Sequence, residues 1–413
     1  MLKAAGITAE YNPLHNGHIY HIEETRRVTG CDAVVVAMSG NYVQRGEPAI
    51  MNKWIRTEHV LKSGADLVLE IPVLFCLGNA RQYADAAVRI LESTGRITDI
   101  SFGSESGDAE SLIRIARTFK DNEPEIEAAV KSLRGKGFSY PAARALVYSE
   151  VSAATKGTDP EQDSEIARDI RILDKSNDIL AIEYIRAMQY ASPTVIHREG
   201  AGYGDPYDER IVYQSASAIR TQALHGNDTS KYVPECTASS MKESHLTGPD
   251  CDSWFDALRY AILSNDAEII EDCPSGGEGL AFLLKDSAVT AESWSALVRH
   301  VKSKRYTYTR LSRLCMQILL GISRKRYNID RPEYIRVLGF NDKGRELLAE
   351  MRDEDTASLP VIINVNKSAK DLSEKALALL QLDMHASDIY NLMTTGEIGT
   401  YSDHIHSPII IKK

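Results

Sequence analysis

Several patterns that mark specialised proteins are missing from this sequence. No apolar run approaches the roughly twenty residues needed to cross a membrane, and the N-terminal residues lack the layout of a signal peptide. The six cysteines are scattered, with no CxxC pair and no zinc-ligand spacing. We therefore expect a cytoplasmic protein with reduced thiols, without a membrane segment, an obligatory protein partner or a metal ion bound by its own side chains.

Common nucleotide-binding and catalytic signatures are missing too. The GxxxxGK[ST] phosphate loop does not occur, and the glycines at 200–204 lack the strand-to-helix context of a dinucleotide fingerprint. We interpret this glycine cluster as a mobile loop near the site. No Ser/His/Asp or Cys/His arrangement is evident, so a covalent intermediate on the protein is not required by the sequence. Internal repeats and low-complexity stretches are also absent.

What remains is a chain of 413 residues, 43% hydrophobic and 26% charged, which is long enough for two or three domains. Its net charge of −10 argues mildly against nucleic-acid binding, but the distribution of charge matters more than the sum. Between residues 299 and 336 there are eleven arginines and lysines against two acids, with tyrosines interleaved. We call residues 299–336 the basic segment.

The basic segment suits phosphate contacts and stacking on unpaired bases, as in RNA binding. The alternative is a solvated helix face. The candidate RNA contacts are Lys302, Lys304, Arg305, Arg310, Arg313, Lys325 and Arg326.

Short apolar runs alternate with amphipathic stretches over residues 1 to about 120. The runs at 4–9, 33–38, 66–71 and 98–102 predict buried strands, with helices between them. This alternation predicts an α/β fold, with an N-terminal Rossmann-like parallel sheet and right-handed crossovers, followed by a mostly helical C-terminal part. A fifth strand is expected at 194–198.

Three polar connections, at 10–18, 39–50 and 103–108, each follow a predicted strand. Ligands on parallel sheets bind beyond the carboxyl ends of the strands, so these connections are expected to form one site. In the second connection, Gln44 and Arg45 are candidates to meet a carboxylate or a phosphate; the alternative is a solvated loop.

The first connection carries two histidines, in the order His15-Asn16-Gly17-His18, where the first strand leads into the first helix. A helix N-terminus attracts phosphate, and Gly17 lets the backbone come close to a ligand. Both histidines can donate a hydrogen bond to an oxygen on which charge builds up, as transfer at a nucleotide α-phosphate requires. The alternative is a polar surface turn or a helix cap.

Other candidate residues stand at predicted element ends. Arg198, at the carboxyl end of the fifth strand, can hold phosphate through its planar fork. Asn177 and Asp178 lie in the first turn of a helix predicted from about 176 to 188, where capping alone would explain one of them. Ser215 or Ser217 can cap a further helix whose N–H groups can take phosphate; a simply capped helix is the alternative.

Together these motifs resemble the HxGH nucleotidyltransferase superfamily, and within it the bacterial tRNA(Met) cytidine acetate ligase family. The resemblance covers nearly the whole chain and is looser in the C-terminal third. At 215–220, where synthetases of the superfamily carry a lysine-rich loop, this chain has none, which fits the small-substrate branch. The stretches that carry the resemblance are 9–18, 38–48, 64–72, 102–105, 176–184 and 215–220.

The resemblance implies an ATP-dependent ligase of the acid–amine type. Acetate and ATP would give acetyl-adenylate, and the acetyl group would pass to N4 of the wobble cytidine, at position 34, of elongator tRNA(Met), giving N4-acetylcytidine. Mg²⁺ is expected to accompany ATP, which is a substrate. By resemblance the catalytic residues are His15, His18 and Arg198.

The resemblance also implies which residues contact the substrates. The candidates for acetate are Ser39, Asn41, Gln44 and Arg45. Those for ATP are Thr8, Ala9, Glu10, Tyr11, Asn12, Pro13, Leu14, His15, Asn16, Gly17, His18, His21, Gly103, Asn177, Arg198 and Ser217.

We expect residues 1–235 to form the catalytic domain, with a helical insertion at about 109–190, and residues 236–413 to form a mostly helical tRNA-binding domain. Two alternatives remain. A small-molecule adenylyltransferase would share the HxGH motif but would not explain the basic segment. A non-catalytic RNA-binding protein would have no need of intact His15, Gly17, His18 and Arg198.

Overall fold

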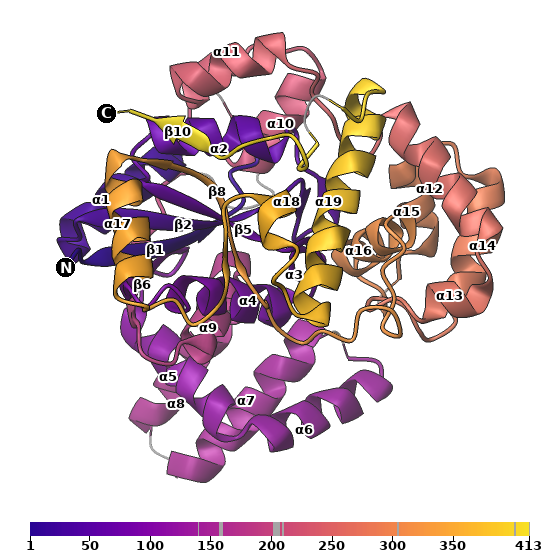
Figure 1. Cartoon of the computed structure of the whole chain (residues 1–413). Helices are drawn as coiled ribbons and strands as arrows, with labels where there is room; N and C mark the ends of the chain where they lie inside the picture. Colours follow the sequence, from indigo (N-terminus) through magenta and orange to yellow (C-terminus); the bar gives the residue numbers. More distant parts are fainter. Residues whose placement is uncertain are drawn as a thin grey trace.

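The computed structural model describes residues 1–412 except 139, 157–159, 201–206, 209, 304, 400 and 401. Its centre is a sheet in the order β10-β8-β5-β2-β1-β6-β7, with β9 paired to β8 (Figure 1). The five strands from the N-terminal half pair in parallel, which confirms the predicted Rossmann-like sheet. They are β1 (Ala4–Ala9), β2 (Ala33–Ser39), β5 (Leu67–Ile71), β6 (Ile97–Ser104) and β7 (Ser192–His197).

Helices cover both faces of this sheet because its strands are apolar on both faces. On one face, Ile7 and Val36 pack with side chains of α1 (Asn16–Thr29) and α2 (Lys53–Lys62). On the other, Val35 and Leu69 pack with α4 (Ala80–Glu92) and α9 (Ser176–Ala187). After β2 the chain forms a small hairpin of β3 (Tyr42–Val43) and β4 (Glu47–Pro48), and α3 (Val73–Cys76) follows β5.

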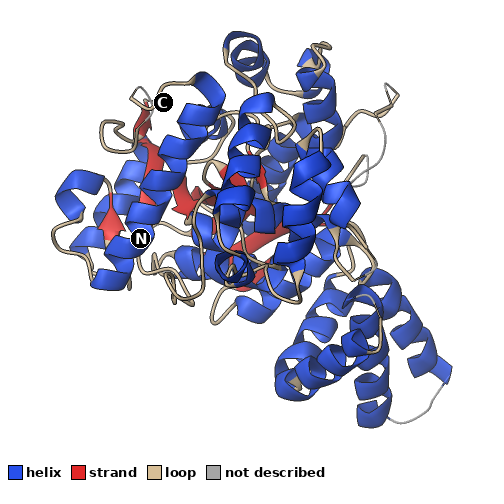
Figure 2. Cartoon of the chain, turned by 90° about the vertical axis from the view of Figure 1, so that its right-hand side faces the viewer, coloured by secondary structure: helices blue, strands red, loops and turns tan. Residues whose placement is uncertain are grey.

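Four helices between β6 and α9 form a lobe that projects from the sheet (Figures 1 and 2). They are α5 (Ala109–Asp121), α6 (Glu123–Gly135), α7 (Tyr140–Lys156) and α8 (Pro160–Ile172). Leu112, Ile115 and Phe119 of α5 belong to the same apolar cluster as the sheet, so α5 joins the lobe to it.

The chain after β7 is helical over a long stretch. Helices α10 (Ala216–Leu224) and α11 (Glu235–Glu243), with a short 3-10 turn at Ser230–Tyr232 between them, lie beside α2 (Figure 1). A helical unit follows, packed around Trp254 and Trp294. Its helices are α12 (Asp252–Ser264), α13 (Ala267–Glu271), α14 (Leu280–Thr290), α15 (Trp294–Val301) and α16 (Tyr308–Leu319).

After the helical unit, the chain returns to the central sheet and adds three more strands to it. The sequence did not predict that these strands join the sheet. β8 pairs antiparallel with β5, and β9 and β10 pair in parallel with β8. The sheet thus takes strands from both sides of residue 235, and the division of tasks between 1–235 and 236–413 stays a prediction. The elements of this return are β8 (Ile335–Asn341), α17 (Asp342–Asp353), β9 (Val361–Ile362), α18 (Val365–Ser368), α19 (Glu374–Thr395) and β10 (Ile409–Ile411).

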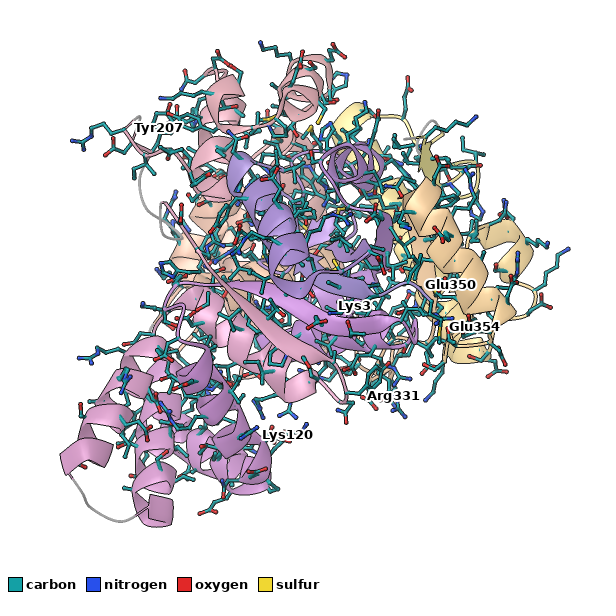
Figure 3. The ribbon with its side chains drawn as sticks, turned by 90° about the vertical axis from the view of Figure 1, so that its left-hand side faces the viewer. Lys3, Lys120, Tyr207, Arg331, Glu350 and Glu354 are labelled. Atoms are coloured by element: carbon teal, nitrogen blue, oxygen red, sulfur yellow. The ribbon has the colours of Figure 1, made fainter. Side chains whose placement is uncertain are left out.

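Polar contacts fasten the returning chain to the N-terminal strands. Figure 3 shows Glu350 on α17 and Glu354 directly after this helix, on the side where Lys3 precedes β1. The Leu2 N–H donates to Glu350 Oε2 at 3.1 Å, and Arg96 pairs with Glu354 at 2.6 Å. Within the described ranges, no helix combines the length and the apolar character that a membrane crossing requires.

Candidate active site

One cavity of about 440 Å³ opens at the carboxyl ends of the central strands. Its walls come from the loops after β1, β2 and β7, from the carboxyl end of β6 and from the starts of α9 and α10, and include Tyr11, Gln44, Gly103 and Arg198. The three polar connections therefore meet at one site, as the strand order predicts. The roles of the individual residues there stay predictions.

The two histidines of the HxGH motif begin helix α1 and line the cavity. His15 Nδ1 accepts from the Gly17 N–H at 3.1 Å, and His18 Nδ1 accepts from the His15 N–H at 3.3 Å. Their rings stack with centroids 3.7 Å apart. Because each neutral ring accepts at Nδ1, its proton is on Nε2, so both rings keep one donor that the cap does not use.

Burial in the cavity wall decides the charge of these histidines. It lowers the pKa of His15 to about 3, with further lowering by the nearby Arg198 and Arg220. The pKa of His18 lies well below its usual range for the same reason, with His15 and Arg198 adding to the effect, and that of His21 is lowered to about 4. All three are therefore neutral at pH 7 and act as hydrogen-bond donors or acceptors.

Because these histidines are buried in the neutral form, the folded protein should become less stable at acidic pH, and His15 should account for part of this loss. An unfolded histidine gains a proton as the pH falls below about 6.5, whereas folded His15 does not until about pH 3. The unfolded state therefore binds more protons in that window, and the free energy of unfolding falls by about 2 kcal/mol between pH 7 and pH 5 through this residue. His15→Asn keeps a capping acceptor and should show a smaller loss between these pH values in urea unfolding. An unchanged pH dependence would contradict the assignment.

Arg198 and Asn177 stand together on the β6–β7 side of the cavity. Arg198 Nη1 donates to Asn177 Oδ1 at 3.3 Å, and Asn177 Nδ2 donates to Glu105 Oε1 at 2.6 Å. A Cβ on Gly103 would lie 3.0 Å from Arg198 Cγ, so glycine gives the arginine side chain room to pass. This places a guanidinium at the cavity wall beside Gly103, as the sequence predicts.

Asp178 has a structural task that differs from helix capping. Its carboxylate accepts from Ser104 Oγ at 2.6 Å and from the N–H groups of Glu105 and Ser106 at 2.9 and 3.0 Å. The side chain thereby holds the loop after β6 against the start of α9. It is not among the residues that line the cavity in the described chain.

The loop after β2 divides into cavity residues and supporting residues. Gln44 and Arg45 line the cavity, and the Gln44 N–H donates to Glu10 Oε1 at 2.8 Å. Ser39 and Asn41 do not line it: Ser39 Oγ contacts the Tyr83 hydroxyl at 3.2 Å, and Asn41 Oδ1 accepts from the Lys53 N–H at 2.7 Å. Of the four acetate candidates, only Gln44 and Arg45 are therefore placed to touch a ligand in this cavity.

Most of the ATP candidates line the cavity, and a few do not. Those that line it are Thr8, Ala9, Glu10, Tyr11, Asn12, His15, Gly17, His18, His21, Gly103, Asn177 and Arg198. Pro13, Leu14, Asn16 and Ser217 are outside the set that lines it. At the start of α10 the cap is Ser215, whose Oγ accepts from the Ala218 N–H at 3.2 Å.

Cavity residues that sequence reasoning missed come from more distant elements. Arg220 of α10 donates to the Asn12 carbonyl at 2.7 Å and lies 3.7 Å from Glu47 of the hairpin. Tyr20 and Tyr213 also line the cavity, and their ring centroids are 6.1 Å apart. Arg220 closes the motif at 215–220 and could have been singled out there; the two tyrosines have no comparable local signal.

Several buried polar atoms at the cavity have no partner among the described residues. They are Thr8 Oγ1, Tyr11 Oη, Asn12 Nδ2, Gln214 Oε1 and Arg313 Nε. Buried polar groups in native proteins are normally paired, so these atoms fit a site completed by a polar ligand. Tyr11 also has a φ of 46°, a left-handed conformation that costs energy for an aromatic residue and is typical of functional sites.

The candidate RNA contacts are less uniform than the sequence implies. Lys302, Arg305, Lys325 and Arg326 are exposed. Arg305 and Arg310 both pair with Glu278, at 2.8 and 3.4 Å, and Arg313 lines the cavity. Lys304 lies outside the described residues, as does most of the glycine cluster at 200–204.

Comparisons with known proteins agree with this geometry. A family model described as HIGH Nucleotidyl Transferase matches residues 2–403. A tRNA(Met) cytidine acetate ligase from Clostridium perfringens is 34% identical over 419 residues, covering 100% of both chains, and one from Fervidobacterium nodosum is 35% identical with 95% of each covered.

Solved structures give the same result. The apo crystal structure of Thermotoga maritima TmcAL superposes with a TM-score of 0.89, at 30% identity and with 100% of both chains covered. The same protein bound with alpha-thio ATP superposes with a TM-score of 0.87 over the same coverage.

Proposed function

Because this chain belongs to the tRNA(Met) cytidine acetate ligase family of the HIGH nucleotidyltransferases, we propose that its cavity is where ATP activates acetate for transfer to tRNA. The protein is an ATP-dependent tRNA(Met) cytidine acetate ligase. The observation that carries the proposed site is the pair of neutral histidines at the N-terminus of α1, each with an Nε2–H that the helix cap leaves unused.

ATP binds with its phosphates over the start of α1 and its remaining contacts on the β6–β7 side. The free N–H groups and partial positive charge of the helix start attract the phosphates. Arg198, between Gly103 and Asn177, supplies a fixed cation on that side. Arginines outnumber carboxylates around the cavity, where Arg45, Arg198, Arg220 and Arg313 stand against Glu10 and Glu199, so a polyphosphate is electrostatically favoured.

In the first step, an acetate oxygen attacks the α-phosphorus of ATP. A bond forms between that oxygen and phosphorus, the bond from the α-phosphorus to the bridging oxygen breaks, and pyrophosphate leaves with the electron pair. Negative charge grows on the α-phosphate oxygens and on the leaving group as this happens. Hydrogen bonds from His15, His18 and Arg198 stabilise that charge. The cavity also lowers the barrier by holding acetate and the α-phosphate in line.

In the second step, the N4 amine of the wobble cytidine attacks the carbonyl carbon of acetyl-adenylate. The new C–N bond forms, AMP leaves, and the amine loses one proton, giving N4-acetylcytidine at position 34 of elongator tRNA(Met). An amine that attacks an activated acyl group needs no nucleophile from the protein. The base must leave the anticodon stack to reach the cavity.

We propose that Mg²⁺ binds together with the phosphates of ATP. Among the described residues, no group of three or more His, Cys, Asp or Glu side chains could hold a metal ion. The steps above are assigned to the protein's arginines, histidines and helix N-terminus.

The tRNA is held by the exposed cations of the basic segment. Lys302, Arg305, Lys325 and Arg326 lie on the surface of the helical unit and of the loop that follows α16. Phosphate contacts from such residues position an RNA without reading its sequence. The tRNA-binding role of residues 236–413 thus rests on these side chains, although the same part of the chain also completes the sheet.

The double variant Lys325→Gln, Arg326→Gln tests the tRNA surface. We expect its KM for tRNA to rise about tenfold, and the salt dependence of tRNA binding to weaken by about one unit of slope for each phosphate that is no longer neutralised. Filter binding across a salt series measures both. Lys367→Gln, Lys370→Gln removes the same charge from another exposed site and should change neither; equal effects of the two double variants would contradict the assignment.

ATP–pyrophosphate exchange without RNA tests the first step. Purified protein should exchange labelled pyrophosphate into ATP only when acetate is present. Exchange in the absence of any acid, or exchange that occurs only with acids larger than acetate, would favour a small-molecule adenylyltransferase. Absence of exchange both with and without tRNA(Met) would overturn the proposed activation of acetate.

A further inference from the structure

Arg313 belongs to the helical unit, yet its side chain lines the cavity built by the sheet. Figure 1 shows α16 between the sheet and helices α12 and α14. Helix α16 packs directly on the β3–β4 hairpin, where Ser312 Oγ donates to the Gly46 carbonyl at 2.7 Å. A Cβ on Gly46, whose φ is +80°, would lie 2.2 Å from the Arg313 nitrogen, so the two backbones are in contact. This contact places the Arg313 side chain beside Gln44 and Arg45.

The bonding of Arg313 differs from that of other arginines in the basic segment. Arg310 pairs with Glu278 and donates to the carbonyls of Ser275 and Gly276, and Arg324 donates to the carbonyls of Glu271 and Pro274. Arg313 donates from Nη1 to the Gln44 carbonyl at 3.3 Å. Its Nε is buried without a partner, and no carboxylate of the described residues lies within ion-pair distance.

The electrostatic surroundings of Arg313 favour an anion. Burial, with repulsion from Arg310 and Arg45, lowers the pKa of Arg313 to about 10, so it remains charged at pH 7. A largely desolvated guanidinium near like charges is unfavourable unless an anion meets it. Its fork matches a carboxylate or a phosphate through two parallel hydrogen bonds.

The order of the strands indicates which anion Arg313 would bind. On one side of β1, Gly103 lies near the carboxyl end of β6 and Arg198 follows β7. Gln44 follows β2 on the other side, and the HxGH histidines follow β1 between them. Because the proposed ATP contacts lie on the β6–β7 side of the cavity, the group that attacks phosphorus is expected on the β2 side. That group is a carboxylate, whose approach to a polyphosphate requires a fixed positive charge that water does not screen.

We propose that Arg313 binds the carboxylate of the substrate acid on the β2 side of the cavity, with Gln44 beside it, an inference that rests on the proposed function. The acid subsite is then shared between the sheet's hairpin and the helical unit. Arg313, predicted from the sequence as an RNA contact, acts instead on the small substrate.

Steady-state ATP–pyrophosphate exchange without RNA tests this proposal in the full-length protein. We expect Arg313→Gln to raise the acetate concentration for half-maximal exchange about tenfold to a hundredfold, which is the usual effect of losing a charge-assisted hydrogen-bonded pair. The corresponding ATP concentration should change by less than about threefold, because the ATP contacts lie across β1. Arg313→Lys keeps the positive charge but lacks the two-pronged guanidinium, so its effect should be intermediate. This variant also tests the proposal if Arg313→Gln does not fold.

Arg299→Gln is the matched control, since it removes an exposed arginine of the same helical unit. Its half-maximal acetate concentration should equal that of the wild type. An Arg313 variant with unchanged acetate dependence but a raised KM for tRNA would identify an RNA phosphate contact and overturn the proposal. An equal rise for ATP and acetate would overturn it as well. Failure of the wild type to exchange at all would instead count against the proposed function.

Discussion

The His18→Ala variant should lose acetate-dependent ATP–pyrophosphate exchange by a factor of about 10² to 10³, the usual effect of removing one preorganised donor from a developing negative charge. His18 lines the cavity at the start of α1, and its Nδ1 is already used by the His15 N–H. The substitution removes the Nε2–H donor and one half of the helix cap. Because the lowered pKa keeps the ring neutral, the loss should be similar at pH 6 and pH 8.

His225→Ala is the control for this result. His225 is exposed at the end of α10, and its ring contacts the Thr221 carbonyl. Exchange by this variant should match the wild type within about twofold, as surface substitutions away from a site usually do. If His18→Ala exchanged within threefold of the wild type while remaining folded by circular dichroism, the role given to the HxGH motif would be wrong.

Asp403→Ala should lower the free energy of unfolding by about 3–5 kcal/mol, the usual effect of breaking a buried ion pair on one side. Asp403 Oδ2 accepts from Lys53 Nζ and from Arg336 Nη1, both at 2.9 Å, and from Ser387 Oγ at 3.0 Å. Lys53 and Arg336 also pair with Glu70. All four charged residues are buried, so removing Asp403 leaves two cations facing one carboxylate.

This cluster joins α2 and β5, near the start of the chain, to β8 and to the segment after α19. Asp353→Ala provides a matched control, because its ion pair with Arg352 is exposed; it should cost less than about 1 kcal/mol. Urea unfolding of both variants measures the difference. A loss below 1 kcal/mol for Asp403→Ala would show that the segment after α19 is not an integral part of the sheet domain.

The N-terminal half of the fold and the centre of the site were predictable because their signals are local. The strands β1, β2 and β5 are short, mostly apolar runs, and the histidine motif lies within four residues of sequence. The parallel arrangement then brings the loops after β1, β2 and β6 together without further information. This is why Gln44, Gly103 and Arg198 could be placed near the histidines from the sequence.

The rest depends on contacts between distant residues. β8 contains Arg336 and Gly339, which interrupt an otherwise apolar run. The charge of buried Arg336 is paired with two carboxylates that are distant in sequence: Asp403, 67 residues later, and Glu70 in β5. Glu278, which pairs with Arg305 and Arg310, likewise lies outside the basic segment. A count of charges along the sequence therefore does not show which cations are paired with carboxylates elsewhere in the chain. Arg313 reaches the cavity only because α16 packs on the hairpin.

Incubation of the purified protein with labelled acetate, ATP and tRNA(Met), followed by nucleoside mass spectrometry, tests the central claim most directly. We predict label in N4-acetylcytidine at position 34, formed only with ATP present and matched by equal amounts of AMP and pyrophosphate. Transfer of label without ATP, release of ADP and phosphate in place of AMP and pyrophosphate, or the absence of acetylcytidine despite acetate-dependent exchange would contradict it.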